Sequence, residues 1–79
     1  MPRYCFHVED GKKIIDDEGT VLAGVEEART EAVVVSGEML KDHGRKFWNN
    51  GEWRLWVTDE SGEAVCALRF AAEHPLDAA

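Results

Sequence analysis

The sequence is poor in cysteine, in basic residues and in long apolar stretches. Its 79 residues include two cysteines, Cys5 and Cys66, which are too few for a disulfide scaffold. No stretch approaches the roughly 18 apolar residues of a membrane-spanning helix, and the N-terminus has no apolar segment of the signal-peptide kind. We therefore expect a protein of the reducing cytoplasm that has no membrane partner.

Positive charge is also scarce. Lys and Arg number 9 against 16 Asp and Glu, which gives a formal net charge of −7. This balance argues against a surface that binds nucleic acid or anionic lipid as a whole, because both are polyanions, but it allows a local basic patch. The hydrophobic share of 44% is typical of a globular chain, and the length suffices for one domain with one modest core.

The N-terminal segment predicts a β-hairpin. Residues 3–8 alternate with period two, so that one face is apolar and the other is polar. Asp10 and Gly11 are typical of a turn, and residues 12–15 are expected to form the second, short strand.

The C-terminal half predicts a second hairpin. Residues 53–58 and 64–70 alternate with the same period. Gly62 closes the intervening turn, where a left-handed conformation is expected.

The spacing between the hairpins is helical. Over residues 25–43 the apolar side chains recur every three or four positions. Gly24 is expected as N-cap and Gly44 as the left-handed residue that ends the helix, while 49–51 are typical of a loop. Basic side chains gather at the helix end, where they neutralise the dipole or, alternatively, form a phosphate-binding corner. They are Lys41, His43, Arg45 and Lys46.

The order β-β-α-β-β predicts an α+β fold, a four-stranded antiparallel sheet with one helix packed on one face. We expect a single domain over residues 1–70 and a flexible C-terminal tail over 71–79. The predicted core consists of the inward-facing apolar residues of each element. They are Tyr4, Phe6, Val8, Leu22, Val25, Ala28, Ala32, Val35, Met39, Leu40, Trp53, Leu55, Val57, Leu68 and Phe70.

The sheet face turned away from the helix is expected to be cationic and to carry an aromatic ring. Its candidate partner-binding residues are Arg3, His7, Arg54, Trp56 and Arg69. Trp and Arg are enriched among interface anchors, which favours a protein-interaction module that forms a homodimer or binds an unknown protein partner. The alternative is single-stranded nucleic acid or RNA, stacked on Trp56 and neutralised by the three arginines. A solvated face whose arginines pair with neighbouring carboxylates is equally compatible with the pattern.

The cysteine, histidine and acidic side chains do not have the spacing of a catalytic or metal-binding site. Cys5 and His7 lie two residues apart on one strand face, where their side chains do not meet, and no third group orients them. The acidic residues near the first turn lack the alternating spacing of a calcium loop, and the three histidines form no zinc-type pair. We therefore expect no enzymatic activity, no metal and no cofactor.

The opening Pro-Arg-Tyr-Cys-Phe-His at residues 2–7, the Asp10-Gly11 pair and the Asp-x-x-Gly spacing of Asp16 and Gly19 resemble a bacterial family, domain of unknown function 6894. The resemblance continues through Ala-Arg-Thr-Glu-Ala in the helix and the last hairpin, about residues 1–70. Cys5 stands where the family usually has Phe. The resemblance implies a single small domain and assigns it no activity, substrate or cofactor.

Overall fold

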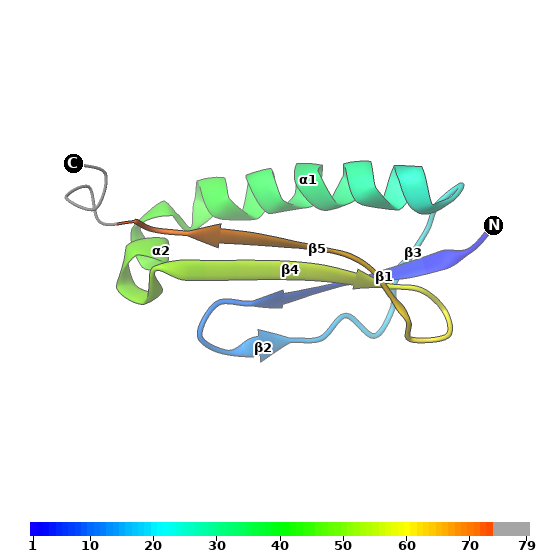
Figure 1. Ribbon diagram of the computed structural model, residues 1–79, viewed down its shortest axis with the longest axis horizontal. Coiled ribbons are helices and arrows are strands. Elements are labelled where there is room, and N and C mark those ends of the chain that lie inside the picture. The colour runs from blue at the N-terminus through cyan, green and yellow to red at the C-terminus, as the bar shows by residue number, and fades with distance from the viewer. Residues whose placement is uncertain (74–79) are drawn as a thin grey trace.

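The computed structural model describes residues 1–73, in which one antiparallel sheet carries a long helix across one face and a short helix at one end (Figure 1). In chain order the elements are β1 (Arg3–Glu9), β2 (Lys13–Ile14), β3 (Thr20–Val21), α1 (Val25–Asp42), α2 (Gly44–Asn50), β4 (Glu52–Thr58) and β5 (Ala64–Ala71). Neither helix is long and apolar enough to cross a membrane.

The sheet order is β2-β1-β4-β5, so the expected four-stranded antiparallel arrangement is confirmed. The structure adds two short elements to the predicted order, the strand β3 and the helix α2. β3 pairs with the start of β1, opposite Arg3 and Tyr4, whereas β2 pairs with the end of β1, opposite Val8 and Glu9. One edge of the sheet is therefore covered by two separate short strands.

Small residues let α1 lie close to the sheet. Ala28, Ala32 and Ser36 recur every four positions and are fully buried, so they form the contact stripe of the helix. Trp53, Leu55 and Val57 on β4 fill the space beneath them, as alternation predicted.

Most of the predicted core is confirmed, and two members are wrong. Tyr4 and Val8 are buried, as are the α1 and β4 residues just described, and the remaining correct members are partly buried against the same cluster. These partly buried members are Phe6, Leu22, Val35, Met39, Leu40 and Leu68. Val25, the first residue of α1, is 49% exposed and lies outside the core cluster, which on α1 begins at Ala28. Phe70 contacts the Trp53 ring with centroids 5.8 Å apart, yet it is 37% exposed because β5 is the last strand.

The helix end differs from the prediction. Gly44 is not a left-handed terminator but the first residue of α2, and residues 49–50 belong to that helix rather than to a loop. Phe47 of α2 is partly buried against the core. This tertiary contact stabilises a short helix that the local sequence does not favour by itself. Gly51, with φ 76°, ends the helix instead.

The second hairpin contains a bulge. Gly62 has φ 87°, as the turn prediction required. Val57 pairs with Cys66 while Thr58 pairs with Ala64, so Val65 is an extra residue that breaks the alternation. Val65 was expected on the outer face and packs against the core cluster instead.

β5 runs one residue beyond the predicted domain boundary. Ala71 belongs to the strand, and the Ala72 N–H donates to the Gly51 carbonyl at 2.8 Å. The predicted flexible tail lies, from residue 74 onward, outside the described residues.

The two tryptophans of β4 should differ sharply in their effect on stability. Trp53 is 2% exposed, so Trp53→Ala is expected to cost about 3–5 kcal/mol of unfolding free energy, most of a small domain's stability. Trp56 is half-buried on the other face, and Trp56→Ala should cost far less. Urea unfolding of both variants at low protein concentration measures the difference. Equal losses would contradict the face assignment.

Candidate functional site

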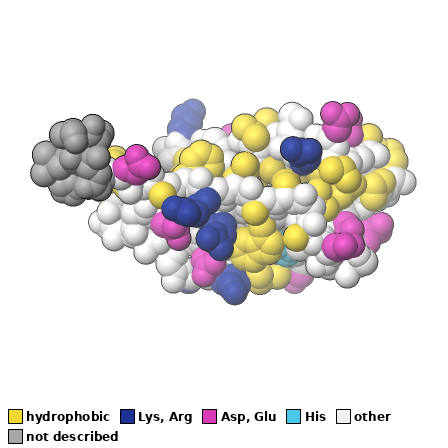
Figure 2. Space-filling model, in the orientation of Figure 1, with side chains coloured by type: hydrophobic (Ala, Val, Ile, Leu, Met, Phe, Trp, Pro, Cys, Tyr) yellow, Lys and Arg dark blue, Asp and Glu magenta, His cyan; other side chains and the backbone are white. Residues whose placement is uncertain are grey.

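The outer face of the sheet, on the side away from α1, holds three of the five candidate residues together. The register places Arg54 opposite Arg69, with Glu9 on the other side of Arg54. One row along, Trp56 lies between His7 and Ala67. Figure 2 shows Lys and Arg side chains next to hydrophobic surface in the lower half of the molecule.

Arg69 is partly neutralised by its own sheet. Its Nε lies 3.0 Å from Oε2 of Glu52, and both side chains are about half exposed. An exposed pair of this kind contributes about 0–1 kcal/mol to stability, so Arg69 can leave it to bind another group at little cost. Within residues 1–73 it is the one ion pair, and Arg54 makes none.

Arg3 lies apart from the other candidates. β4 ends at Thr58, which pairs with Cys5, so Arg3 projects beyond the end of that strand. Its Nη1 donates to the Glu18 carbonyl at 2.9 Å. The structure therefore ties Arg3 to the loop before β3 and does not bring it to Arg54 and Arg69.

His7 was predicted on the open face, but it is only 7% exposed. The segment between β2 and β3 covers it, and the Asp16 backbone N–H donates to Nδ1 at 3.1 Å. Nδ1 is then the acceptor nitrogen, so Nε2 carries the proton and donates to Thr58 Oγ1 at 2.9 Å. The ring also lies against Trp56, with centroids 5.2 Å apart. Both nitrogens are used inside the chain.

The Asp16 side chain fills the gap between β3 and β2 along the edge of β1. Its Oδ2 accepts the Phe6 N–H at 3.0 Å, and its Oδ1 accepts the N–H groups of Glu18 and Gly19. Burial raises the pKa of Asp16, but the hydrogen bonds from the backbone N–H groups of Gly19, Phe6 and Glu18 oppose it, and the net pKa is lowered. The carboxylate thus takes the place of a strand partner.

Gly19 is required by the same turn. Its φ is +77°, and a Cβ there would lie 2.7 Å from Cγ of Arg3 and 3.0 Å from the Tyr4 carbonyl oxygen. The fold therefore explains the Asp-x-x-Gly spacing. Asp16 and Gly19 together form a turn, called here the Asp16 clasp, that holds the loop before β3 against β1.

The cysteines are both free and half-buried. Cys5 is on the outer face and Cys66 on the inner face, as predicted. Burial raises the pKa of Cys66, although Arg29 opposes the shift. In the described part of the chain, no three His, Cys, Asp or Glu side chains form a group that could hold a metal ion.

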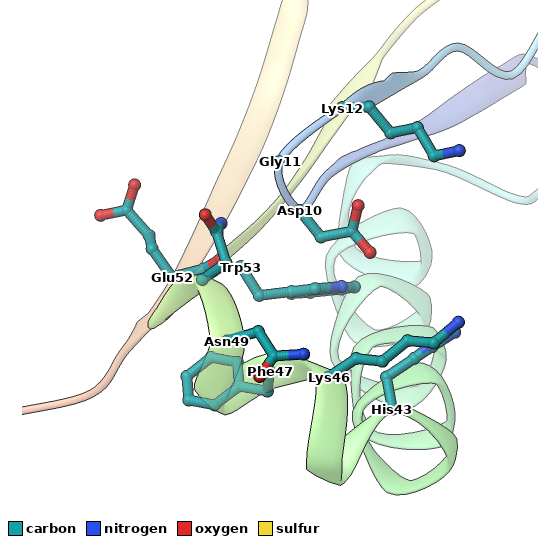
Figure 3. Close-up of a pocket in the computed structure, with 10 residues that line it drawn as sticks. Asp10, Gly11, Lys12, His43, Lys46, Phe47, Asn49, Glu52 and Trp53 are labelled. Atoms are coloured by element: carbon teal, nitrogen blue, oxygen red, sulfur yellow. The ribbon is translucent and has the colours of Figure 1, made fainter.

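A cleft of about 560 Å³ lies at the end of the sheet that carries α2 (Figure 3). Of the basic cluster at the helix end, His43 and Lys46 line it, and both ring nitrogens of His43 are buried without a hydrogen-bond partner. Asp10 and Lys12 reach it from the first turn, so both signs of charge face the cleft. Sequence reasoning missed this grouping because its members are more than thirty residues apart.

The other edge of the sheet was also missed. No strand of residues 1–73 pairs with the outer side of β5. A hollow of about 330 Å³ lies between β5 and α1, and a second of about 260 Å³ lies between the end of β5 and α2. Val33 at the first hollow is 59% exposed and Trp48 at the second is 71% exposed. Exposed apolar side chains therefore flank this strand.

A family model described as a domain of unknown function (DUF6894) matches residues 3–71. The match spans every strand and both helices. No curated protein and no solved structure matches the chain.

Replacing the clasp carboxylate should destabilise the fold in a pH-dependent way. Asp16→Asn is expected to cost about 1–3 kcal/mol near neutral pH, because charge-assisted hydrogen bonds are weakened. Since the folded pKa of Asp16 is lowered, its contribution is present above the unfolded-state pKa and is lost as the pH falls through the folded pKa. The difference between wild type and variant in urea unfolding should therefore shrink in acid. Asp17→Asn, an exposed neighbour, is the control and should change little. A pH-independent difference would contradict the account.

Proposed function

The chain belongs to the family of domains of unknown function 6894, and we propose that it is a non-enzymatic interaction module. It binds a second copy of itself through the open edge of its sheet, which is β5. The observation that carries the proposal is the contrast between the two sheet edges. The β1 edge is covered by β2, β3 and the Asp16 clasp. β5 offers eight residues with one charged side chain, Arg69, and no strand of residues 1–73 pairs with its outer side.

An uncovered, apolar edge strand is unusual for a protein that works alone. Monomeric proteins protect such edges with charges, prolines, bulges or covering loops, because unpaired backbone groups recruit other strands. The bulge at Val65 protects only the start of β5. The remaining residues present backbone donors and acceptors for which pairing is favourable.

A second copy suits this edge because an antiparallel strand can pair with itself across a two-fold axis, and closed two-fold dimers are the commonest assemblies. Pairing at β5 also joins the outer faces of the two copies. Trp56, Arg54 and Arg69 then form part of one wider surface, with side-chain types that are enriched at interfaces.

The absence of catalysis and the cytoplasmic location remain parts of the proposal. Both nitrogens of His7 are held by internal hydrogen bonds, which supports a structural role for that residue. Cys5 and Cys66 are free and lie on opposite faces, which suits a reducing compartment.

Single-stranded nucleic acid is the second candidate. Arg54 and Arg69 lie directly opposite each other beside a half-buried tryptophan, and such a like-charged pair is tolerated best where an anion lies between its members. The two candidates respond to salt in opposite directions. Two copies of net charge −7 repel each other, so added salt screens the repulsion and strengthens self-association. Added salt weakens binding to nucleic-acid phosphates, because the release of counterions from the nucleic acid becomes less favourable.

Sedimentation and light scattering over increasing protein concentration test the proposal. We expect the mass to rise from 8.9 kDa toward twice that value, at lower concentration when salt is added. A species of 8.9 kDa at every concentration would refute self-association. Binding of a single-stranded oligonucleotide that falls steeply with salt and is lost in Arg54→Ala would establish the second candidate instead.

A further inference from the structure

We propose that the cleft at the α2 end of the sheet binds a small oxyanion, a carboxylate or a phosphate, through Lys12, Lys46 and His43. This site goes beyond the proposed function and does not depend on self-association. The cleft's volume of about 560 Å³ lies within the range of about 300–1,000 Å³ that is typical of small-molecule sites. Figure 3 shows Lys12 and Asp10 on one wall of the cleft. Lys46 and His43 lie on the facing wall, with the Trp53 ring between the two walls.

Local hydrogen bonds shape both walls. In the first turn the Asp10 N–H donates to the Lys12 carbonyl at 3.2 Å, and Gly11 between them has φ 104°. A Cβ on Gly11 would contact the Asn50 side chain at 3.9 Å, so the turn passes close to the last residue of α2. Asn50 is itself held, because its Nδ2 donates to the Glu52 carbonyl at 2.9 Å. The cleft is therefore formed by the chain before any ligand enters it.

The charged groups of the cleft favour an anion. Glu52 is among the lining residues, but its carboxylate pairs with Arg69 at 3.0 Å and points away from the cleft in Figure 3. Lys12, Lys46 and Asp10 remain, and none of them belongs to an ion pair within residues 1–73. The cleft thus presents two positive charges against one negative charge, in a chain whose formal net charge is −7.

His43 contributes a polar group for which residues 1–73 provide no partner. Both of its ring nitrogens are buried and make no hydrogen bond within those residues. Most buried polar groups in native proteins have a partner, and an unsatisfied one destabilises the fold. His43 lines the cleft together with Lys46, three residues further along the chain. An oxyanion bound to the Lys46 ammonium can therefore accept a hydrogen bond from a ring N–H after a small rotation of the ring.

Asp10 and two aromatic rings narrow the class of ligand. The Asp10 carboxylate repels a bare anion, but it accepts a hydrogen bond from a hydroxyl or ammonium group on the same ligand. Phe47 and Trp53 add apolar lining for the carbon atoms of such a ligand. A phosphate ester of a polyol and an amino acid both combine an oxyanion with a donor, and both should bind more tightly than inorganic phosphate.

A titration followed by amide NMR spectra tests the site, with inorganic phosphate, glycerol phosphate and serine as probes at constant pH and ionic strength. Comparison of the last two probes distinguishes a phosphate site from a carboxylate site. We expect saturable shifts in residues 10–12 and 43–50 and in the Trp53 indole. No saturable shift with any of the three probes would refute the site and would leave self-association untouched.

Matched lysine and arginine variants separate a built site from general attraction. Lys12→Gln and Lys46→Gln are each expected to weaken binding of the tighter probe about tenfold, through loss of a charge-assisted hydrogen bond. Lys13→Gln and Arg45→Gln remove the same charge from neighbours outside the cleft lining, and they should change affinity less than about twofold. All four side chains are exposed, so the variants should fold. Equal losses in all four would refute the site.

Two further variants test the acceptor and the ring. Asp10→Asn should strengthen binding of inorganic phosphate and weaken binding of serine, because it removes both the repulsion and the acceptor. His43→Phe keeps a ring and removes both nitrogens, so the midpoint of urea unfolding should not fall, while affinity for the tighter probe falls about tenfold. A lower midpoint with unchanged affinity would show that the His43 ring is purely structural and would refute its role in binding.

Discussion

The Asp16 carboxylate determines how this sheet ends. One edge of β1 has partners at both of its ends but none in the middle, and Asp16 supplies the missing acceptor to the Phe6 N–H. The same side chain holds the turn that includes Gly19, and the Asp16 backbone N–H fixes the His7 ring. Because His7 then lies against Trp56, the single residue Asp16, through its carboxylate and its backbone N–H, links the covering loop to the outer face.

This constraint gives the sheet two unlike edges. A covered edge and an open edge in one small domain leave few ways for another strand to add. The open edge belongs to β5, beside apolar hollows and next to Arg54 and Trp56. The functional proposal rests on this contrast, because the turn at Asp16 and Gly19 closes one edge to strand pairing and leaves the edge of β5 open within the described residues.

Local patterns predicted the sheet and its main helix because alternation and helical spacing report burial directly. Trp53, Leu55 and Val57 follow that rule. Alternation fails to predict burial where another part of the chain covers or shifts a residue. The loop at Asp16, nine residues away, buries His7, and the bulge moves Val65 to the other face. Arg54 and Trp56 lie together as predicted, but Arg3 is held elsewhere by Glu18. The free edge of β5 could not be predicted, because a sequence pattern does not give strand order.

Amide hydrogen exchange at low and high protein concentration tests most directly whether β5 is the binding surface. In the dilute protein, outward-pointing amides of Ala64–Ala71 have no partner strand among residues 1–73 and should exchange quickly. The account predicts that these amides become protected as concentration rises, while those of β2 and α2 stay unchanged. Exchange in β5 that is independent of concentration, with association detected elsewhere on the molecule or nowhere, would contradict it.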